Sequence, residues 1–162
     1  MVMKKEAAKR RLNLVSAVFS AEEVYREARK AGDALKYTFI EREQEFKPAK
    51  YGHERKFVFM LTRHVDDFAR VEVEIEMRFE NLNKVKHDGK ELDKGDVDMV
   101  LTSNVVLDYR NRWGMRRFHR ALFDFYLEYF VKERFKKLYF IPAVNDLNAI
   151  YEAIKERAEY YR

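Results

Sequence analysis

The sequence contains no cysteine, so disulfide frameworks, thiol nucleophiles and cysteine-based zinc sites are all excluded. Glycine and proline are scarce as well, with 5 and 2 residues among 162. A chain with so few breakers that is 47% hydrophobic is expected to fold rather than stay disordered. No stretch approaches the ~20 apolar residues of a membrane span, and the basic start is not followed by the apolar stretch of a secretion signal. The cytoplasm is therefore the expected location.

Charged residues are abundant and nearly balanced. They make up 38% of the chain, and 33 basic against 28 acidic residues give a net charge of +5. This composition resembles that of proteins from hot environments, and the positive balance permits an anionic partner without requiring one. The length predicts a single domain, residues 1–162.

The segment Ala69 to Phe79 gives the clearest strand prediction. Its apolar residues share one parity and its charged residues share the other, which is the pattern of a strand with one buried and one wet face. The apolar row is Ala69, Val71, Val73, Ile75, Met77 and Phe79, and the opposite row is Arg70, Glu72, Glu74, Glu76, Arg78 and Glu80.

Further strands are predicted on both sides of this segment. Apolar residues over 37–46 and 57–61 predict a hairpin, because Pro48 and a Lys-Tyr-Gly turn separate them. Residues 97–109 repeat the alternation after a polar stretch that contains two turns, Asp88-Gly89 and Lys94-Gly95. The strands are therefore predicted to form an antiparallel meander.

The start of the chain leaves two interpretations open. Residues 4–11 are rich in helix formers, whereas 12–19 alternate as in a strand, although a helix remains possible there. A capping box formed by Ser20 and Glu23 then predicts the start of a helix that ends near Gly32.

Helical spacing returns after Trp113. A long aromatic helix is predicted from Met115 to Lys136, and its apolar residues occupy more than one side. An amphipathic helix from Val144 to Tyr161 ends the chain. The predicted fold class is therefore α+β, with a curved antiparallel sheet packed on the long aromatic helix and one extra helix at the C-terminus.

This order of elements resembles the helix-grip superfamily that includes START domains, polyketide cyclases and Bet v 1-like proteins. The resemblance spans roughly residues 11–135 and is carried by a first strand, a helix opening at Ser20-Ala21-Glu22-Glu23-Val24-Tyr25, a run of strands and the long helix. It implies a curved sheet around that helix and a cavity between them for a hydrophobic small molecule. The terminal helix departs from the family pattern.

Candidate ligand-binding residues follow from this expectation. Ser103 interrupts an apolar strand face, and a buried hydroxyl must find a partner, which is either a ligand or a local group. The stripe of the aromatic helix either lines the cavity, belongs to the core or forms a homodimer or partner interface. The residues assigned to the ligand site are Ser103, Phe118, Leu122, Phe125, Tyr126 and Tyr129.

Arginines cluster around the predicted start of the aromatic helix. Arg112, Arg116 and Arg120 are spaced by four, so they are expected to share a helical face that can hold an anion. The alternative is countercharge from Asp124 or from the glutamates of the 69–80 strand. Together with the basic amino end, the cluster between Arg110 and Arg120 also permits nucleic-acid binding, which is the least favoured alternative.

Catalytic and metal signatures are weak. The three serines and the absence of cysteine make a nucleophilic triad improbable. His64 with Asp66 and Asp67 comes nearest to a metal cluster, but a turn of polar residues between strands is its ordinary explanation. Any acid-base chemistry is expected to use His119 or Asp108. The sequence therefore favours a binding protein without a cofactor over an enzyme.

Overall fold

The computed structural model describes residues 2–112, 117–126, 128–129 and 132–161, apart from the side chain of Phe118. Five strands and four α-helices follow one another along the described chain, with a π-helical turn at Lys136–Phe140 before the last helix. In chain order they are β1 (Met3–Phe19), α1 (Ala21–Ala34), β2 (Thr38–Ala49), β3 (Gly52–His64), β4 (Ala69–His87), β5 (Lys90–Leu107), α2 (Arg117–Tyr126), α3 (Lys132–Phe135) and α4 (Ile141–Ala158).

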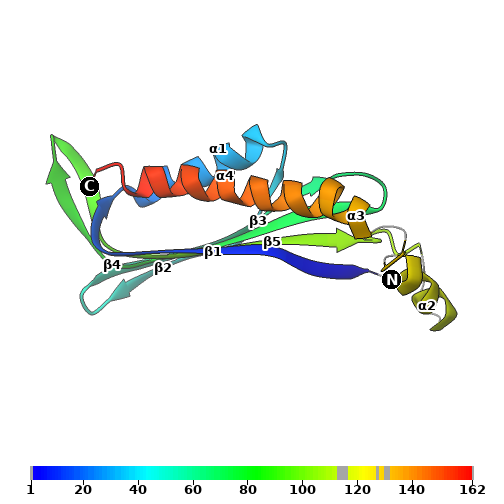
Figure 1. Cartoon of the computed structure of the whole chain (residues 1–162). Coiled ribbons are helices and arrows are strands. Elements are labelled where there is room, and N and C mark those ends of the chain that lie inside the picture. The colour runs from blue at the N-terminus through cyan, green and yellow to red at the C-terminus, as the bar shows by residue number, and fades with distance from the viewer. Residues whose placement is uncertain (1, 113–116, 127, 130–131, 162) are drawn as a thin grey trace.

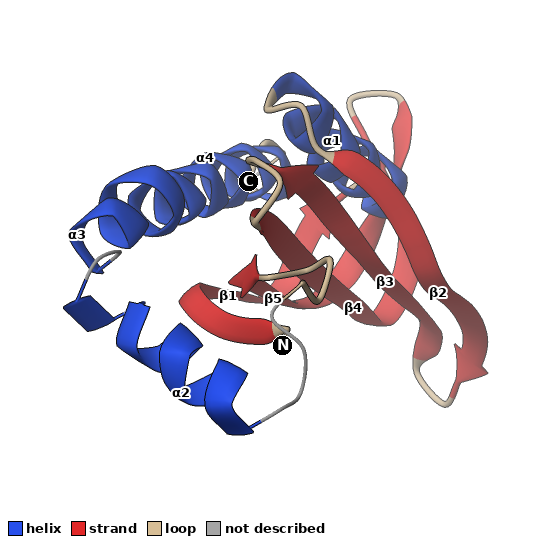
Figure 2. Cartoon of the chain, turned by 90° about the vertical axis from the view of Figure 1, so that its right-hand side faces the viewer, coloured by secondary structure: helices blue, strands red, loops and turns tan. Residues whose placement is uncertain are grey.

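The strands form one antiparallel sheet in the order β1-β5-β4-β3-β2. Strands β2 to β5 form a meander, and the first strand returns beside the last, so β1 and β2 are the edges. The sheet curves around the helices on one of its faces (Figures 1 and 2). The predicted α+β class and the antiparallel meander are thus confirmed.

The alternating pattern of β4 places one complete row in the core. All six apolar residues from Ala69 to Phe79 are fully buried. They pair in register with apolar residues on both sides, for example Ile75 with Phe59 of β3 and with Leu101 of β5. The period of two therefore predicted this face correctly.

Strand β1 resolves the ambiguity at the start of the chain. Residues 3–19 are all strand, including the segment rich in helix formers, because pairing with β5 supplies backbone hydrogen bonds that outweigh helix propensity. The ladder shifts register between Leu14 and Ala17, where Ser16 has φ 50°. Leu14 is consequently buried while Val15 is exposed, and the alternation resumes in another phase toward Phe19.

The predicted start of α1 is confirmed. The Ser20 hydroxyl accepts a hydrogen bond from the Glu23 amide at 3.3 Å. The second half of the capping box is absent, because the Glu23 carboxylate accepts from the Arg157 guanidinium at 2.6 Å and from the Tyr161 hydroxyl at 3.1 Å. Glu23 therefore ties α1 to the C-terminal end of the chain.

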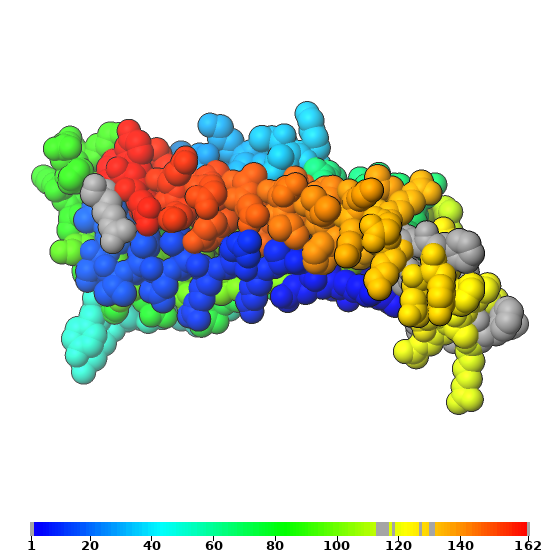
Figure 3. Space-filling view, viewed as in Figure 1, coloured from blue at the N-terminus to red at the C-terminus, as the bar shows by residue number. Residues whose placement is uncertain are grey.

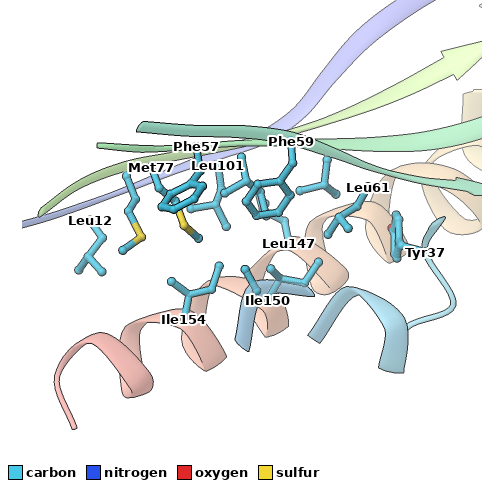
Figure 4. Packing of buried hydrophobic residues seen from close by; sticks show 14 of the residues in the cluster. Leu12, Tyr37, Phe57, Phe59, Leu61, Met77, Leu101, Leu147, Ile150 and Ile154 are labelled. Carbon is cyan, nitrogen blue, oxygen red and sulfur yellow. The ribbon is translucent and has the colours of Figure 1, made fainter. Parts of the chain in front are cut away.

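The helix that packs along the sheet is α4, not the aromatic helix. Buried Leu147, Ile150 and Ile154 point from α4 toward the apolar row of the sheet (Figure 4). Helix α1 lies beside α4 on the same face, whereas α2 projects past the end of the sheet (Figures 1 and 3). The prediction that residues 115–136 form the covering helix was therefore wrong. No helix in the described part of the chain is both long and apolar enough to cross a membrane.

Candidate functional site

The end of the molecule at which β1 begins and β5 ends carries an open pocket of about 320 Å³. We call it the end pocket. It lies between the sheet and residues of α2 and α3, and its lining residues are Met3, Lys5, Leu107, Asp124, Glu128, Lys132 and Phe135.

Sheet pairing positions one wall of the end pocket. Met3 and Leu107 are direct partners in the β1–β5 ladder, and Lys5 follows two residues later on the same face. Phe135 of α3 closes the other side, and the Lys5 ammonium lies 5.8 Å from the centre of its ring, within cation–π range. The pocket thus has an apolar base and two lysines and two carboxylates among its lining residues.

Ser103, which was assigned to the ligand site, lies in the core. Its side chain is fully buried and its hydroxyl donates to the Ala143 carbonyl of α4 at 3.4 Å. The partner of the hydroxyl is thus a group of the protein, although not a local one, since Ala143 lies 40 residues further along the chain. Ser103 does not line the end pocket.

The predicted aromatic stripe is largely exposed. Phe125 and Tyr129 are 52% and 68% exposed, with ring centres 4.7 Å apart, and Leu122 and Tyr126 are also exposed. None of these four lines the end pocket, and the side chain of Phe118 lies outside the described residues. Among the described side chains of α2, Phe123 reaches the core: it is fully buried and has its ring 6.0 Å from that of Phe68.

The three arginines predicted to share a helical face lie partly outside the described residues. Arg112 lies in the turn after β5, ahead of α2, and Arg116 lies outside the described residues. Arg120 is exposed on α2 and makes no ion pair within the described part of the chain. Of the three, only Arg120 lies in the described helix α2, Arg117–Tyr126, so their shared helical face stays a prediction.

The countercharge for the arginines comes from Asp67. Its carboxylate lies 3.2 Å from the Arg110 guanidinium and 3.8 Å from that of Arg112. The Arg112 backbone amide also donates to the buried Asp108 carboxylate at 2.8 Å. The alternative of charge pairing thus describes these two arginines, although the predicted acidic partners were Asp124 and the β4 glutamates.

The turn between β3 and β4 has a structural explanation. Asp66 accepts hydrogen bonds from the Phe68 and Ala69 amides at 2.8 Å and from the Tyr139 hydroxyl at 2.5 Å. Burial raises the pKa of Asp66, but these hydrogen bonds outweigh it and hold the pKa below its usual value. Its neighbour His64 stacks on Tyr109 with ring centres 4.8 Å apart. Among the described residues, no group of three histidine, aspartate or glutamate side chains is placed to hold a metal ion.

A partly buried charge pair that the sequence analysis missed joins α4 to the sheet. The Arg63 guanidinium lies 2.6 Å from the Asp146 carboxylate, which also accepts from the Tyr37 hydroxyl at 2.8 Å. Arg63 donates in addition to the Leu35 carbonyl at 3.0 Å. Burial and the hydrogen bond to Asp146 raise the pKa of Tyr37 well above its usual value. The signal for this pair was Arg63 itself, the charged residue that continues the buried row Phe57, Phe59, Leu61 on β3.

Two comparisons with known proteins add no assignment to this geometry. Neither the protein-family models nor the curated proteins that were searched contain a match to this chain.

Proposed function

We propose that this chain is a helix-grip-like protein that binds an amphipathic small molecule in the end pocket. The strand order supports the helix-grip assignment, since β1 lies beside the last strand and a C-terminal helix packs on the curved sheet. The helix in the gripped position is α4, and α2 and α3 are inserted before it.

The end pocket is a better candidate for the ligand than the space beneath α4. Under α4 the side chains of Leu147, Ile150 and Ile154 meet the aromatic and aliphatic residues of the sheet (Figure 4). A ligand there would have to displace this core, which costs contact and transfer free energy. The end pocket is already formed, and its volume falls within the usual range for small-molecule sites.

The lining of the end pocket defines the class of ligand. Met3, Leu107 and Phe135 offer an apolar base for a short hydrocarbon or ring. Lys5 and Lys132 can pair with an anionic head group, and this pairing is the feature that we take to select the ligand. An apolar base beside charged groups, two lysines and the two carboxylates Asp124 and Glu128, is the observation that carries the proposal of an amphipathic ligand.

Filling the pocket is expected to weaken ligand binding. In titration calorimetry with decanoate, Met3→Trp should weaken binding by at least about tenfold, because the indole occupies the space of the hydrocarbon chain and about 1.4 kcal/mol is tenfold. Lys132→Glu should weaken the binding of decanoate and strengthen the binding of decylamine, since it reverses one of the charges that face the head group of the ligand.

Leu138→Ala is the matched control, because Leu138 is 43% exposed in the π-helical turn and lies outside the pocket lining. It should bind decanoate as the native chain does. Native affinity in Met3→Trp, with its fold intact by circular dichroism, would contradict the proposal.

A homodimer through α2 is a second candidate, favoured by the exposed aromatic residues of its segment. Phe125 and Tyr126 are exposed on α2, which projects from the sheet (Figure 3), and Tyr129 is exposed shortly after it. A second subunit could cover all three. The charges along the segment suit an antiparallel pair about a two-fold axis. Arg117 and Arg120, in the first half of α2, would meet Asp124 in the second half of the same helix of the second subunit.

This candidate predicts a mass of two chains in light scattering at high protein concentration. Phe125→Glu should return the mass to that of one chain, because it places a carboxylate in the centre of the interface. Val15→Glu makes the same change at an exposed site on β1 and should leave the dimer intact. A single-chain mass for the native protein at every concentration would dispose of the dimer.

A further inference from the structure

A second hollow lies on the outer face of the sheet, opposite the helices. We call it the outer groove. It spans β2, β3 and β4 near the end of the molecule and measures about 590 Å³. Its lining residues are Lys36, Thr38, Ile40, Met60, Thr62, Arg63, His64, Arg70 and Glu72.

Neighbouring rungs of the sheet form the floor of the outer groove. Thr62 pairs with Thr38 on one side and with Glu72 on the other, and His64 pairs with Arg70. These residues alternate along their strands with the buried apolar row, so they share the face that the helices leave uncovered (Figure 2).

Two polar atoms of this lining are buried and have no hydrogen-bond partner among the described residues. They are the Thr62 hydroxyl oxygen and Nε of Arg70. A buried polar group without a partner costs free energy, so native proteins rarely leave one without a reason. Two such atoms in the lining of one groove point to a group that binds there.

The neighbourhood of Arg70 carries excess positive charge. The Glu72 side chain is 7% exposed and lies 2.7 Å from Arg70 Nη2 and 3.2 Å from the ammonium of Lys4. One carboxylate thus serves two cations, and neither contact satisfies Nε of Arg70. The guanidinium is also held 5.6 Å from the centre of the Tyr109 ring, so its position is restrained.

A further cation lines the same groove. Lys36 lies in the turn between α1 and β2 with φ 67°, and its ammonium makes no ion pair with any described residue. Arg63 also lines the groove, but its charge is taken by Asp146. The unmatched charges in and beside the groove are therefore positive.

We propose that the outer groove binds the anionic group of a small molecule, a carboxylate or a phosphate. Arg70 Nε and the Thr62 hydroxyl donate to the anion after a small rotation of their side chains, and Lys36 supplies the countercharge. Ile40, which is 43% exposed, and Met60 offer an apolar surface for the rest of the molecule. A metal cation does not fit, because Glu72 is already shared by two cations.

The two anion sources can be separated with phenyl phosphate and benzoate as probes, and benzyl alcohol as the neutral control. We expect at least one of the anions to shift the backbone amide signals of Thr38, Thr62 and Arg70 in nuclear magnetic resonance titrations, and the alcohol to leave them unmoved. A response to phenyl phosphate alone supports a phosphate site, and a response to both supports a general anion site. No shift from either anion at millimolar concentration would overturn the proposal.

Two variants test the donors. Arg70→Lys keeps the charge beside Glu72 but loses Nε and the planar guanidinium, so it should lower the affinity for the anion about tenfold or more. Thr62→Val keeps the shape of the side chain and removes the hydroxyl, so it should lower the affinity for the anion several-fold. It should also raise the denaturation midpoint of the free protein, because an unpaired buried hydroxyl is gone.

Thr102→Val, on the same outer face at β5 and outside the groove lining, should leave anion affinity unchanged. The combined loss of affinity and gain of stability in Thr62→Val separates a binding role from a structural one. Native affinity in both Arg70→Lys and Thr62→Val would contradict the assignment of the donors and with it the site.

Discussion

Replacing Leu147 by alanine is expected to lower the free energy of unfolding by about 2 to 5 kcal/mol, the usual range for a buried leucine. Leu147 is fully buried on α4 and points toward the sheet (Figure 4). Removing its side chain leaves a cavity that the surrounding aromatic residues cannot fill without moving. Urea denaturation monitored by circular dichroism measures the change.

The matched control is Leu122→Ala, the same replacement on the aromatic helix. Leu122 is 44% exposed, so its loss should change the free energy of unfolding by less than about 0.5 kcal/mol when the protein is dilute enough to be monomeric. A larger effect at Leu122 than at Leu147 would mean that the aromatic helix, and not α4, covers the sheet.

This contrast marks where the sequence analysis assigned the covering helix wrongly. Both helices have an apolar stripe, and the aromatic one was chosen because it follows the last strand, as the gripped helix does in the helix-grip superfamily. The chain places small residues, Ala143 and Ala158, together with Leu147 on the buried face of α4, which lets that helix approach the sheet closely. Periodicity predicts that a face is apolar, but it does not say which partner covers that face.

The strands were more predictable because their information is local. The row from Ala69 to Phe79 required only the period of two, and the β2–β3 hairpin required only a turn beside Pro48. The pairing of β1 with β5 joins residues about a hundred positions apart, such as Met3 and Leu107. No local pattern encodes that pairing, so the walls of the end pocket were not predicted.

The arginines illustrate the same limit for charge. Acidic countercharge was one of the two alternatives left open for them, and the residue that supplies it to Arg110 and Arg112 is Asp67, in the β3–β4 turn. Arg63 was recognisable in principle, because a charge that continues a buried row must be paired. Its partner Asp146 comes from α4 and could not be named without the fold.

The two proposed binding sites share an end of the molecule through adjacent residues of β1. Lys4 points to the outer face, where it pairs with Glu72 beside the outer groove. Lys5 points to the opposite face, where it lines the end pocket over Phe135. Because the sites lie on opposite faces of the strand, variants in one should not weaken the other, and the experiments on decanoate and on the aromatic anions are independent.

Alkaline pH is expected to unfold the protein earlier than its charge alone would predict, because two buried tyrosines are bonded to carboxylates. Tyr37 and Tyr139 are 4% and 6% exposed and donate to Asp146 and Asp66. Burial first, and then these hydrogen bonds, raise the pKa of both phenols above the value near 10 that they have in the unfolded chain. Their contribution to stability is therefore complete below pH 10, where both states keep the proton.

Above pH 10 the unfolded chain loses these protons first, and the free energy of unfolding should fall by about 1.4 kcal/mol per pH unit for each tyrosine. Tyr37→Phe is expected to be less stable than the native chain at pH 8 by about 1.5 to 3 kcal/mol, because Asp146 loses a donor. It should nevertheless lose stability more slowly than the native chain between pH 10 and 11.5, since one of the two ionisations is absent. Tyr129→Phe, at an exposed position, should leave the slope unchanged. Equal slopes in Tyr37→Phe and the native chain, measured by urea denaturation at each pH, would show that the Tyr37 phenol does not titrate with unfolding.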